Sequence, residues 1–510
     1  MKRVLLLLIL TSPFISHGQL IFNRTFYGPP GSNQGAFSST VDDAGNIYTV
    51  GTYKDTNPFH WLTLMKLDSA GNLLWSKAND LARSGRKIKK LSDNNILTLG
   101  LVYESTPPTN RSSSLLFKAD TAGNILWSRV YFDTISFAAS DFVELPDKGF
   151  TLTGGWYNIN NQQEGRIFLM RTDSVGNVLW CKLYGNGYPG YYSRSVVTTH
   201  DGGFIVGGNM VDIEDIVVFR TDSLGNLIWS NQFVGAKGDY LESLISLSNG
   251  NYAFGGHSNS FIGTGSWPPF NQLLYQFDST GNKIFCKQYV QGGFFDACYA
   301  LKETQGGNII ITGIGTTKKT DINGNPFLWY GLGMNTSISL LPDESIVFTS
   351  DYGINSQIRI IKTDSLLSPP CYSFNYNPPQ QVTITDEFLP LTLNEISITS
   401  SDSAISTTFF NFNLLDSLYC LTATNIIKHE LNHDISISPN PFIDYISVVN
   451  EGNLIINQLD IYDLAGRFIK TSKYSNEKLN LSYLKQGIYF IKIVSKDKSI
   501  IQLFKICKIN

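Results

Sequence analysis

The sequence feature that most constrains the fold is a nine-residue stretch that the chain repeats along most of its length. The stretch is clearest at Thr221–Trp229 (TDSLGNLIW), and near copies lie at Leu67–Trp75, Ala119–Trp127, Thr172–Trp180 and Phe277–Phe285. Two degenerate copies follow: Asp321–Trp329 carries one inserted residue, and Thr363–Leu367 stops before its Gly-Asn-Trp half. A period of roughly 50 residues built on turns predicts a propeller or a similar array.

A second family of turns alternates with the first. Its seven members place Asp, Asn or Gly before a short apolar run, at residues 43–51, 93–100, 147–154, 201–207, 249–255, 305–313 and 343–350. Such residues supply the backbone angles of hairpin turns, and each apolar run reads as a strand. Each repeat then holds four strands, of which one carries the Trp, and four-stranded units repeated radially are propeller blades. The sequence therefore predicts an all-β chain with a seven-bladed β-propeller over residues 19–367.

The beginning of the chain supplies the half that the last copy lacks. Leu20–Gly28 resembles the Trp strand at Val178–Gly185. We predict that this N-terminal strand pairs with Gln357–Lys362, because that pairing closes the ring and removes an exposed sheet edge.

Consecutive antiparallel strands alternate in direction, so both families of turns fall on one face of the ring. The loops of the opposite face vary in length and content, and such loops on a rigid scaffold are where recognition is usually built. Tolerated insertions are the alternative. Aromatic residues there could stack on sugars or fill pockets, although some must belong to the core. The candidate ligand-binding residues are Trp61, Trp156, Tyr191, Tyr192 and Trp267, with Tyr188 beside them.

No catalytic residue, metal site or cofactor is predicted. His60 and His257 lie in variable loops and His200 precedes a tight turn, positions typical of solitary surface histidines. His429 to His433 reads HELNH and matches a zinc helix, but Pro439 follows closely and no third ligand is near. Asp212, Glu214 and Asp215 lack the spacing of a calcium loop and fit a solvated edge.

Charge gives no case for nucleic acid. The formal net charge is −3, and the basic cluster Arg83–Lys90 is short and is interpreted as a solvated loop. Residues 1–18 have the basic start, apolar middle and small-residue end of a secretory signal peptide, with cleavage expected near Gln19. No later apolar run reaches the length of a transmembrane segment.

Six cysteines in an exported chain make disulfides possible. Cys371 and Cys420 bracket one segment and are the most natural pair. A hairpin at Gly292 would set Cys286 opposite Cys298. Cys181 is expected to be a small buried residue, and Cys507 has no assigned partner.

Residues 368–433 break the repeat pattern. Their Pro-Pro and Ser/Thr-rich stretches indicate a linker, whereas residues 381–398 and 407–415 favour strands. Either an irregular linker or a small β-module is predicted here.

From Asp434 to Asn510 the chain has short strands and no repeat, which suggests a small β-sandwich. Its motifs are Pro439-Asn440-Pro441, Asp463 with Gly466, and Leu484 with Gly487 and Tyr489. In order and spacing they resemble the type A C-terminal sorting domain of the type IX secretion system of Bacteroidetes. That resemblance implies capture by the outer-membrane translocon, removal by a sorting peptidase, and a protein secreted or attached to the outer cell surface.

The repeat over residues 20–367 resembles those of exported bacterial propeller proteins. It is more loosely similar to quinoprotein dehydrogenase repeats and sialidase Asp-boxes, whose Asp-to-Gly spacing differs. We expect a non-enzymatic binding or adhesion module for a glycan or protein ligand. The alternatives are a secreted hydrolase or lyase with acids on the variable-loop face, and a purely structural adhesin.

Overall fold

The computed structural model describes most of the chain with short gaps. It covers residues 20–28, 32–54, 60–79, 81–104, 111–158, 161–186, 190–235, 237–260, 270–290, 295–352, 357–368, 380–383, 388–391, 393, 395–398, 401–404, 409–411, 415–423, 435–440, 442–450, 456–463, 468–474, 478–495 and 500–509. It divides into two compact units, one holding residues 19–423 and the other holding residues 424–510 together with residues 1–18.

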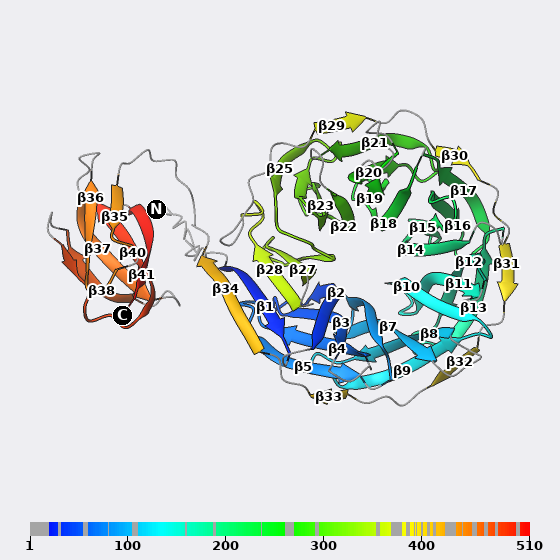
Figure 1. Cartoon of the computed structure of the whole chain (residues 1–510), viewed down its shortest axis with the longest axis horizontal. Helices are drawn as coiled ribbons and strands as arrows, with labels where there is room; N and C mark the ends of the chain where they lie inside the picture. The colour runs from blue at the N-terminus through cyan, green and yellow to red at the C-terminus, as the bar shows by residue number, and fades with distance from the viewer. Residues whose placement is uncertain are drawn as a thin grey trace, which may run out of the picture. The chain divides into compact units, whose positions relative to one another are not determined.

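The larger unit is a ring of seven antiparallel sheets in the described residues (Figure 1). From the centre outwards, the first four blades are β2 (Asn33–Val41), β3 (Ile47–Lys54), β4 (His60–Leu67) and β5 (Leu73–Asn79); β6 (Ser84–Lys90), β7 (Ile96–Glu104), β8 (Arg111–Ala119) and β9 (Ile125–Phe132); β10 (Ser136–Glu144), β11 (Phe150–Asn158), β12 (Asn161–Thr172) and β13 (Val178–Tyr184); and β14 (Tyr191–Thr198), β15 (Phe204–Met210), β16 (Ile216–Thr221) and β17 (Leu227–Phe233).

The remaining blades follow the same order around the ring. Blade five holds β18 (Asp239–Ser246), β19 (Tyr252–Ser258), β20 (Asn271–Phe277) and β21 (Lys283–Val290); blade six holds β22 (Ala297–Glu303), β23 (Ile309–Ile314), β24 (Thr317–Thr320) and β25 (Pro326–Tyr330); and blade seven holds β26 (Ser337–Leu340), β27 (Ile346–Tyr352), β28 (Gln357–Thr363) and β1 (Leu20–Tyr27). The all-β propeller prediction is confirmed. The Trp strand, or its equivalent, is the outermost of the four strands of each blade, so a repeat that is read from that strand straddles two blades.

The repeated turn owes its shape to its Asp. In blade four, Oδ1 of Asp222 accepts hydrogen bonds from the amides of Leu224 and Asn226, at 2.9 and 2.8 Å, and Oδ2 accepts one from the Asn226 side chain at 2.7 Å. Burial alone would raise the pKa of Asp222, but these hydrogen bonds outweigh it and hold the pKa below its usual value. The side chain therefore closes the hairpin as an ionised cap.

The Gly and Trp of the repeat meet across neighbouring blades. Gly225 has a φ of 77°, and a Cβ on it would lie 2.8 Å from the ring of Trp180 in the preceding blade. Likewise, Trp229 Nε1 donates a hydrogen bond to the Ser279 carbonyl of the next blade, at 3.1 Å. Each turn is thus a contact point between blades, which explains why Asp, Gly and Trp recur together.

The ring closes as predicted. β1 pairs antiparallel with β28, with Phe22 opposite Lys362 and Phe26 opposite Ile358. Both families of turns also lie on one face, since the side chain of Arg220, at the end of β16, reaches Asp201 in the other turn at 2.6 Å. The loops between β15 and β16 and between successive blades are on the opposite face.

The described strands of the segment after the ring, between residues 380 and 423, form neither an irregular linker nor a separate β-module. Its strands add a fifth member to the outer edges of six blades, in reverse order around the ring: β29 (Gln380–Thr383) on β21, β30 (Phe388–Pro390) on β17, β31 (Glu395–Ile398) on β13, β32 (Ser401–Ala404) on β9, β33 (Phe409–Asn411) on β5 and β34 (Leu415–Ala423) on β1. We call these six strands the belt, which Figure 1 shows on the rim. The belt covers sheet edges that would otherwise expose unpaired backbone groups.

The core of the ring lies between blades. Phe137 of blade three stacks on Phe168, with ring centroids 3.9 Å apart, and the same cluster takes in Leu97 and Leu116 of blade two. Cys286 and Cys298 are both buried and are not joined by a disulfide, so the pairing that a hairpin at Gly292 would allow does not form. The chain between them passes from the outermost strand of one blade to the innermost strand of the next, and no hairpin brings them together.

Cys181 is buried, as expected, and is not in a disulfide. Cys371 lies outside the described residues. Cys420 is on β34, where its backbone pairs with Asn23.

The smaller unit has two sheets. One holds β35 (Ile435–Ser438), β36 (Tyr445–Asn450) and β39 (Leu479–Asn480), and the other holds β37 (Ile456–Asp463), β38 (Phe468–Lys473), β40 (Gly487–Ser495) and β41 (Ile500–Lys508). One apolar cluster joins Ile446 of the first sheet to Ile461 and Ile491 of the second. The sheets therefore share a core, as in the predicted sandwich.

Candidate binding site at the channel mouth

The innermost strands carry a repeated irregularity that the turns do not reveal. In six blades the register between the first and second strands shifts by one residue, between Ala36 and Ser38 in the first blade and at the matching place in the next five. Each shift leaves one extra residue unpaired, as a β-bulge does. The extra residues are Phe37, Arg86, Ser140, Arg194, Glu242 and Tyr299.

Thr336 takes the same place in blade seven. Its amide donates to the Thr349 carbonyl at 2.8 Å, and Thr349 also pairs with the next residue, Ser337. We call these seven positions the bulge ring. A bulge re-aims a side chain out of the regular pleat, and such bulges are common beside functional sites.

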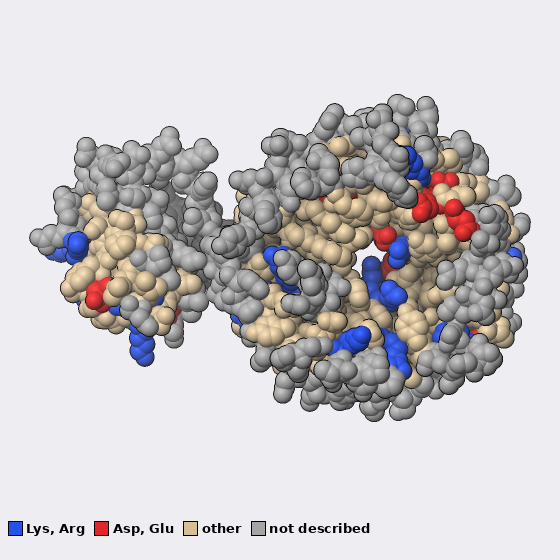
Figure 2. All heavy atoms as spheres, viewed as in Figure 1, with Lys and Arg blue, Asp and Glu red and all other residues tan. Residues whose placement is uncertain are grey.

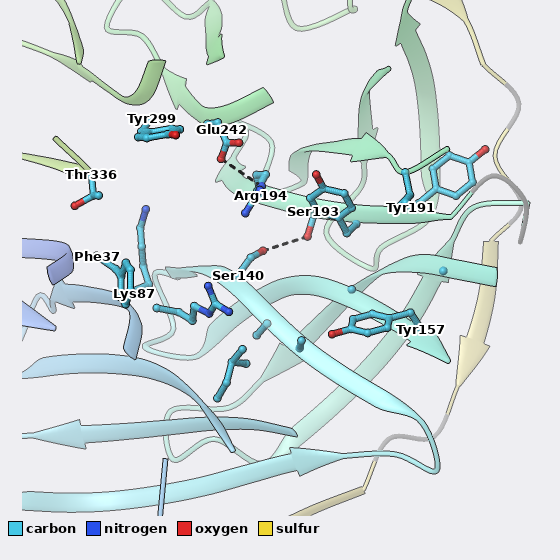
Figure 3. A pocket seen from close by; sticks show the side chains of 18 residues that line it. Phe37, Lys87, Ser140, Tyr157, Tyr191, Ser193, Arg194, Glu242, Tyr299 and Thr336 are labelled. Carbon is cyan, nitrogen blue, oxygen red and sulfur yellow. Dashed lines mark hydrogen bonds and ion pairs between the residues drawn. The ribbon is translucent and has the colours of Figure 1, made fainter. Parts of the chain in front are cut away.

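All seven bulge-ring residues line one cavity of about 540 Å³ at the mouth of the central channel (Figure 3). The channel below it, of about 600 Å³, shares Phe37, Lys87, Glu242, Tyr299 and Thr336 with the mouth. A volume of this size suits a small-molecule or oligomer-end ligand. Figure 2 shows the opening at the centre of the ring with both basic and acidic side chains around it.

Opposite charges face each other within the bulge ring. Arg194 Nε lies 3.3 Å from Glu242 Oε2, an ion pair whose geometry does not make a hydrogen bond, and the guanidinium also lies over the Tyr192 ring at 5.1 Å. Burial raises the pKa of Glu242, and the charge of Arg194 offsets this only in part. Burial would lower the pKa of Arg194, but the Glu242 charge leaves it above its usual value.

The cavity also extends outwards from the axis between blades three and four. Tyr157 and Tyr191 lie at the outer end of this groove (Figure 3), and Tyr192 also lines the cavity. Small residues such as Ala138 and Gly155 form part of its wall. The groove also has hydroxyl groups. Ser140 Oγ lies 3.4 Å from Ser193 Oγ, and the Thr153 hydroxyl donates a hydrogen bond to Ser193 Oγ at 2.8 Å.

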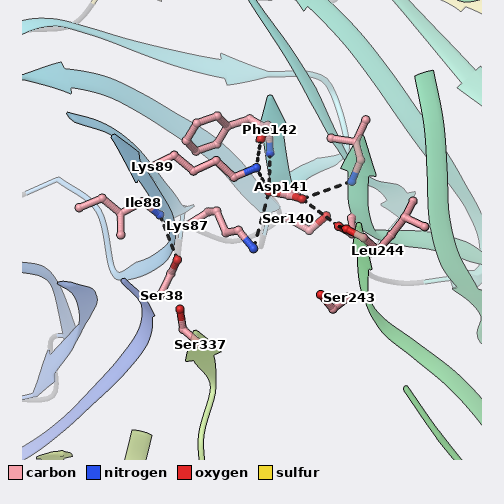
Figure 4. A network of polar contacts seen from close by, with 12 residues as sticks. Ser38, Lys87, Ile88, Lys89, Ser140, Asp141, Phe142, Ser243, Leu244 and Ser337 are labelled. Atoms are coloured by element: carbon pink, nitrogen blue, oxygen red, sulfur yellow. Dashed lines mark hydrogen bonds and ion pairs between the residues drawn. The ribbon is translucent and has the colours of Figure 1, made fainter. Parts of the chain in front are cut away.

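Below the mouth, the carboxylate of Asp141 takes part in a network of hydrogen bonds and ion pairs (Figure 4). Asp141 accepts hydrogen bonds from the Phe142 amide at 2.9 Å, the Ser195 hydroxyl at 3.0 Å and the Val196 amide at 3.2 Å. Lys89 Nζ lies 2.9 Å from Asp141, and Lys87 Nζ lies 3.8 Å from it. Burial would raise the pKa of Asp141, but Lys87, Lys89 and these hydrogen bonds lower it. Asp141 therefore holds the inner strands together as a permanent anion.

The structure brings only part of the predicted aromatic set together. Tyr191, which is 3% exposed, and half-buried Tyr192 line the cavity. Trp61 instead stacks on Tyr53 at 5.9 Å in blade one, and Trp156 donates through Nε1 to Asp133 at 2.9 Å, so neither is among the lining residues. Trp267 and Tyr188 lie outside the described residues.

The interpretation of Arg83–Lys90 as a solvated loop is wrong. Ser84–Lys90 is β6, the innermost strand of blade two, and it brings Arg86 and Lys87 to the cavity. The strand was missed because four of its seven residues are basic and Ile88 is its one large apolar residue. A channel-facing strand needs only one buried face. A signal was present in the sequence: the position lies at a fixed offset before the second turn, as in the other blades.

The described histidines and the acidic loop do not cluster into a metal site. Within the described ranges, no group of three or more His, Cys, Asp or Glu side chains could hold a metal ion. His257 is not a surface residue: it is 8% exposed, stacks on Tyr240 at 5.1 Å, and burial lowers its pKa to about 4. Asp215 is buried and accepts from Gln232 at 2.6 Å, so it is not part of a solvated edge. His429 and His433 lie outside the described residues.

The sorting motifs occupy strand ends of the smaller unit. Leu484 is buried in the core, and Tyr489 Oη donates to the Lys485 carbonyl at 2.8 Å across a turn that contains Gly487. Asp463 ends β37 opposite Tyr489. Pro439 and Asn440 are exposed after β35, while Pro441 and Gly466 lie outside the described residues.

Solved structures with a similar fold share little sequence. PorZ, a surface component of the type IX secretion system of Porphyromonas gingivalis, is 8% identical with a TM-score of 0.38, covering 93% of this chain and 81% of that one. A protein of unknown function from Dyadobacter fermentans is 10% identical with a TM-score of 0.41, covering 68% and 98%. A luciferin-regenerating enzyme is 9% identical with a TM-score of 0.32, covering 66% and 94%. These values are too low to indicate an activity. No curated protein matches the chain.

The family comparison concerns the C-terminal unit. Residues 436–506 match the model of the secretion system C-terminal sorting domain, as the motifs predicted. In the part of the chain that the structure describes, no helix has the length and apolar character of a membrane span. The chain thus ends in a type IX sorting domain, which marks the protein as secreted or attached to the cell surface.

Proposed function

We propose that the propeller is a non-enzymatic binding module, displayed by the secretion system, that takes its ligand at the channel mouth. The observation that carries this proposal is the bulge ring. Seven blades repeat their turns nearly residue for residue, yet they place seven positions of largely different chemistry around one cavity. The lining side chains differ from blade to blade. A ligand without sevenfold symmetry needs such a set of different contacts around its binding site.

The acids of the channel also favour binding over catalysis. Asp141 is held by backbone amides, a hydroxyl and lysines, so it has no freedom to act as a nucleophile or base. Glu242 is paired with Arg194. Hydrolysis of a glycosidic bond usually needs two carboxylates free to act on one substrate.

The proposal extends to the two ends of the chain. Residues 1–18 serve as a signal peptide that is removed near Gln19, and the translocon takes the sorting domain, which a sorting peptidase then cuts off. Mass spectrometry of the protein recovered from the cell surface tests both removals. A surface form that keeps residues 1–18, or the full sorting domain, would contradict the corresponding step.

Binding and turnover screens on the purified chain test the main proposal. On glycan and peptide arrays we expect binding that Tyr299→Ser weakens at least about tenfold, since removing a buried aromatic contact usually costs more than 1 kcal/mol. Tyr103→Ser, which alters an exposed tyrosine outside the cavity, is the matched control. Turnover of any arrayed substrate that Glu242→Gln abolishes would replace the binding function with a hydrolase or lyase.

A further inference from the structure

The cationic character of the mouth is local. Three of the 18 lining residues are cations, Arg86, Lys87 and Arg194, and one is an acid, Glu242, which gives a formal charge of +2. The whole chain carries −3. The channel below balances three cations, Lys87, Lys89 and Lys302, against three acids, Asp141, Glu242 and Glu303. Positive charge is therefore concentrated at the entrance and not deeper in the channel.

One of these cations, Arg86, makes no polar contact with the described residues. Among the described residues, the Arg86 guanidinium has no hydrogen bond or ion pair, and the side chain is exposed at the rim. Lys87 has only the 3.8 Å approach to Asp141, and Arg194 has the ion pair with Glu242. A free guanidinium beside a second cation is suited to a carboxylate, which an Arg fork can bind through two parallel hydrogen bonds.

The rest of the cavity is suited to sugar rings. Half-buried Tyr157 and Tyr192 both line the cavity. Tyr157 lies away from the cations (Figure 3), whereas the Tyr192 ring lies 5.1 Å from the Arg194 guanidinium. An aromatic face packs against the C–H face of a pyranose, while the hydroxyls of Ser140 and Ser193 can exchange hydrogen bonds with sugar hydroxyls. The groove is thus charged at the axis and aromatic further out.

We propose that the ligand is an acidic oligosaccharide of the uronic-acid type, with one carboxylate at Arg86 and Arg194 and neighbouring rings along the tyrosine groove. This inference rests on the proposed binding function and names its ligand class. Glu242 competes for Arg194, so an incoming carboxylate shares that guanidinium or displaces Glu242 from it.

Calorimetric titration of the full chain with tetragalacturonate and with its methyl ester tests the inference, because the two probes share the same sugar rings and the ester replaces each carboxylate with a neutral group. We expect the acid to bind at least about tenfold more tightly than the ester, as charge-assisted hydrogen bonds predict. Arg86→Gln should remove that preference, and Glu242→Gln should increase affinity for the acid. Lys283→Gln, an exposed lysine near a turn of the opposite face, is the control and should change neither.

The outcomes separate this inference from the proposed function. Equal binding of acid and ester, or an unchanged preference in Arg86→Gln, would overturn the charge assignment and leave the binding module intact. Binding of neither probe would also overturn it. Release of shorter fragments from tetragalacturonate would overturn the non-enzymatic function itself.

Discussion

The two faces of the ring differ in how much they repeat. On the turn face, the same Asp, Gly and Trp recur because each turn must cap its own hairpin and contact the neighbouring blade. On the channel-mouth face, the bulge positions are Phe, Arg, Ser, Arg, Glu, Tyr and Thr. The bulge in the backbone therefore recurs from blade to blade, but the residue type at the bulge does not. We infer that stability depends on the repeated residues and that the proposed recognition depends on the ones that vary. The following predictions test that division.

The largest effect should come from deleting Leu20–Gly28. β1 pairs with both β28 and β34, so its loss opens the ring and leaves two strands without a partner. We expect no cooperative thermal transition by circular dichroism. A chain that ends at Ala423 is the control and should keep its transition. An unchanged melting midpoint in the deletion would contradict closure by this strand.

A smaller loss of stability is expected for Gly225→Ala. The new methyl group would meet the Trp180 ring and would sit on a backbone with φ of 77°, so the free energy of unfolding should fall by about 2–3 kcal/mol. Gly250→Ala has a similar φ of 85° and nothing within 4 Å, and it should cost about 1 kcal/mol. Urea unfolding of both variants measures the difference. Equal losses would show that the blade contact at Trp180 contributes nothing.

Acid should weaken the ring through its turns. The pKa values of Asp120, Asp173, Asp222, Asp278 and Asp321 are lowered in the folded state, so their contribution is present above the unfolded pKa of about 3.9 and is lost as pH falls through the lower folded values. The urea midpoint should drop between about pH 4 and pH 2. Asp222→Asn should reduce that slope, and an identical slope in the variant would argue against the capping role.

The smallest effect on stability should come from Arg86→Gln. Its side chain is exposed and has no described partner, so the melting midpoint should change by less than about 1 °C, within the usual range of surface substitutions. A clear destabilisation by differential scanning calorimetry would mean that the bulge ring also supports the fold. In that case the two faces would not divide their roles.

The repeat predicted the blades because local chemistry determines them. Asp, Gly and Asn specify a turn wherever they occur together, so residues 221–229 were readable without tertiary information. The truncated copy at Thr363–Leu367 likewise predicted that the first strand completes the last blade. The order of strands was harder: sequence shows that a Trp strand follows a turn but not which sheet it joins.

The belt and the bulge ring escaped prediction for a different reason. Belt strands such as Phe388–Pro390 are three to nine residues long and gain their partners from blades distant in sequence, so their own pattern resembles a linker. A bulge changes no residue type, and Arg194 in a strand reads as an ordinary solvent-facing position. Only the ladder register shows that Phe37, Arg86 and Arg194 occupy one equivalent place in their blades.

The belt also sets the order of events during folding. Leu20 pairs with Ala423, so the first strand of the ring acquires its last neighbour only after the whole propeller and its outer strands have emerged from the ribosome. Contacts between such distant segments form slowly, because the long loop between them must close first. Until then, the blade edges are open to other chains. The ring and its belt can therefore be completed only once the chain is available as far as Ala423.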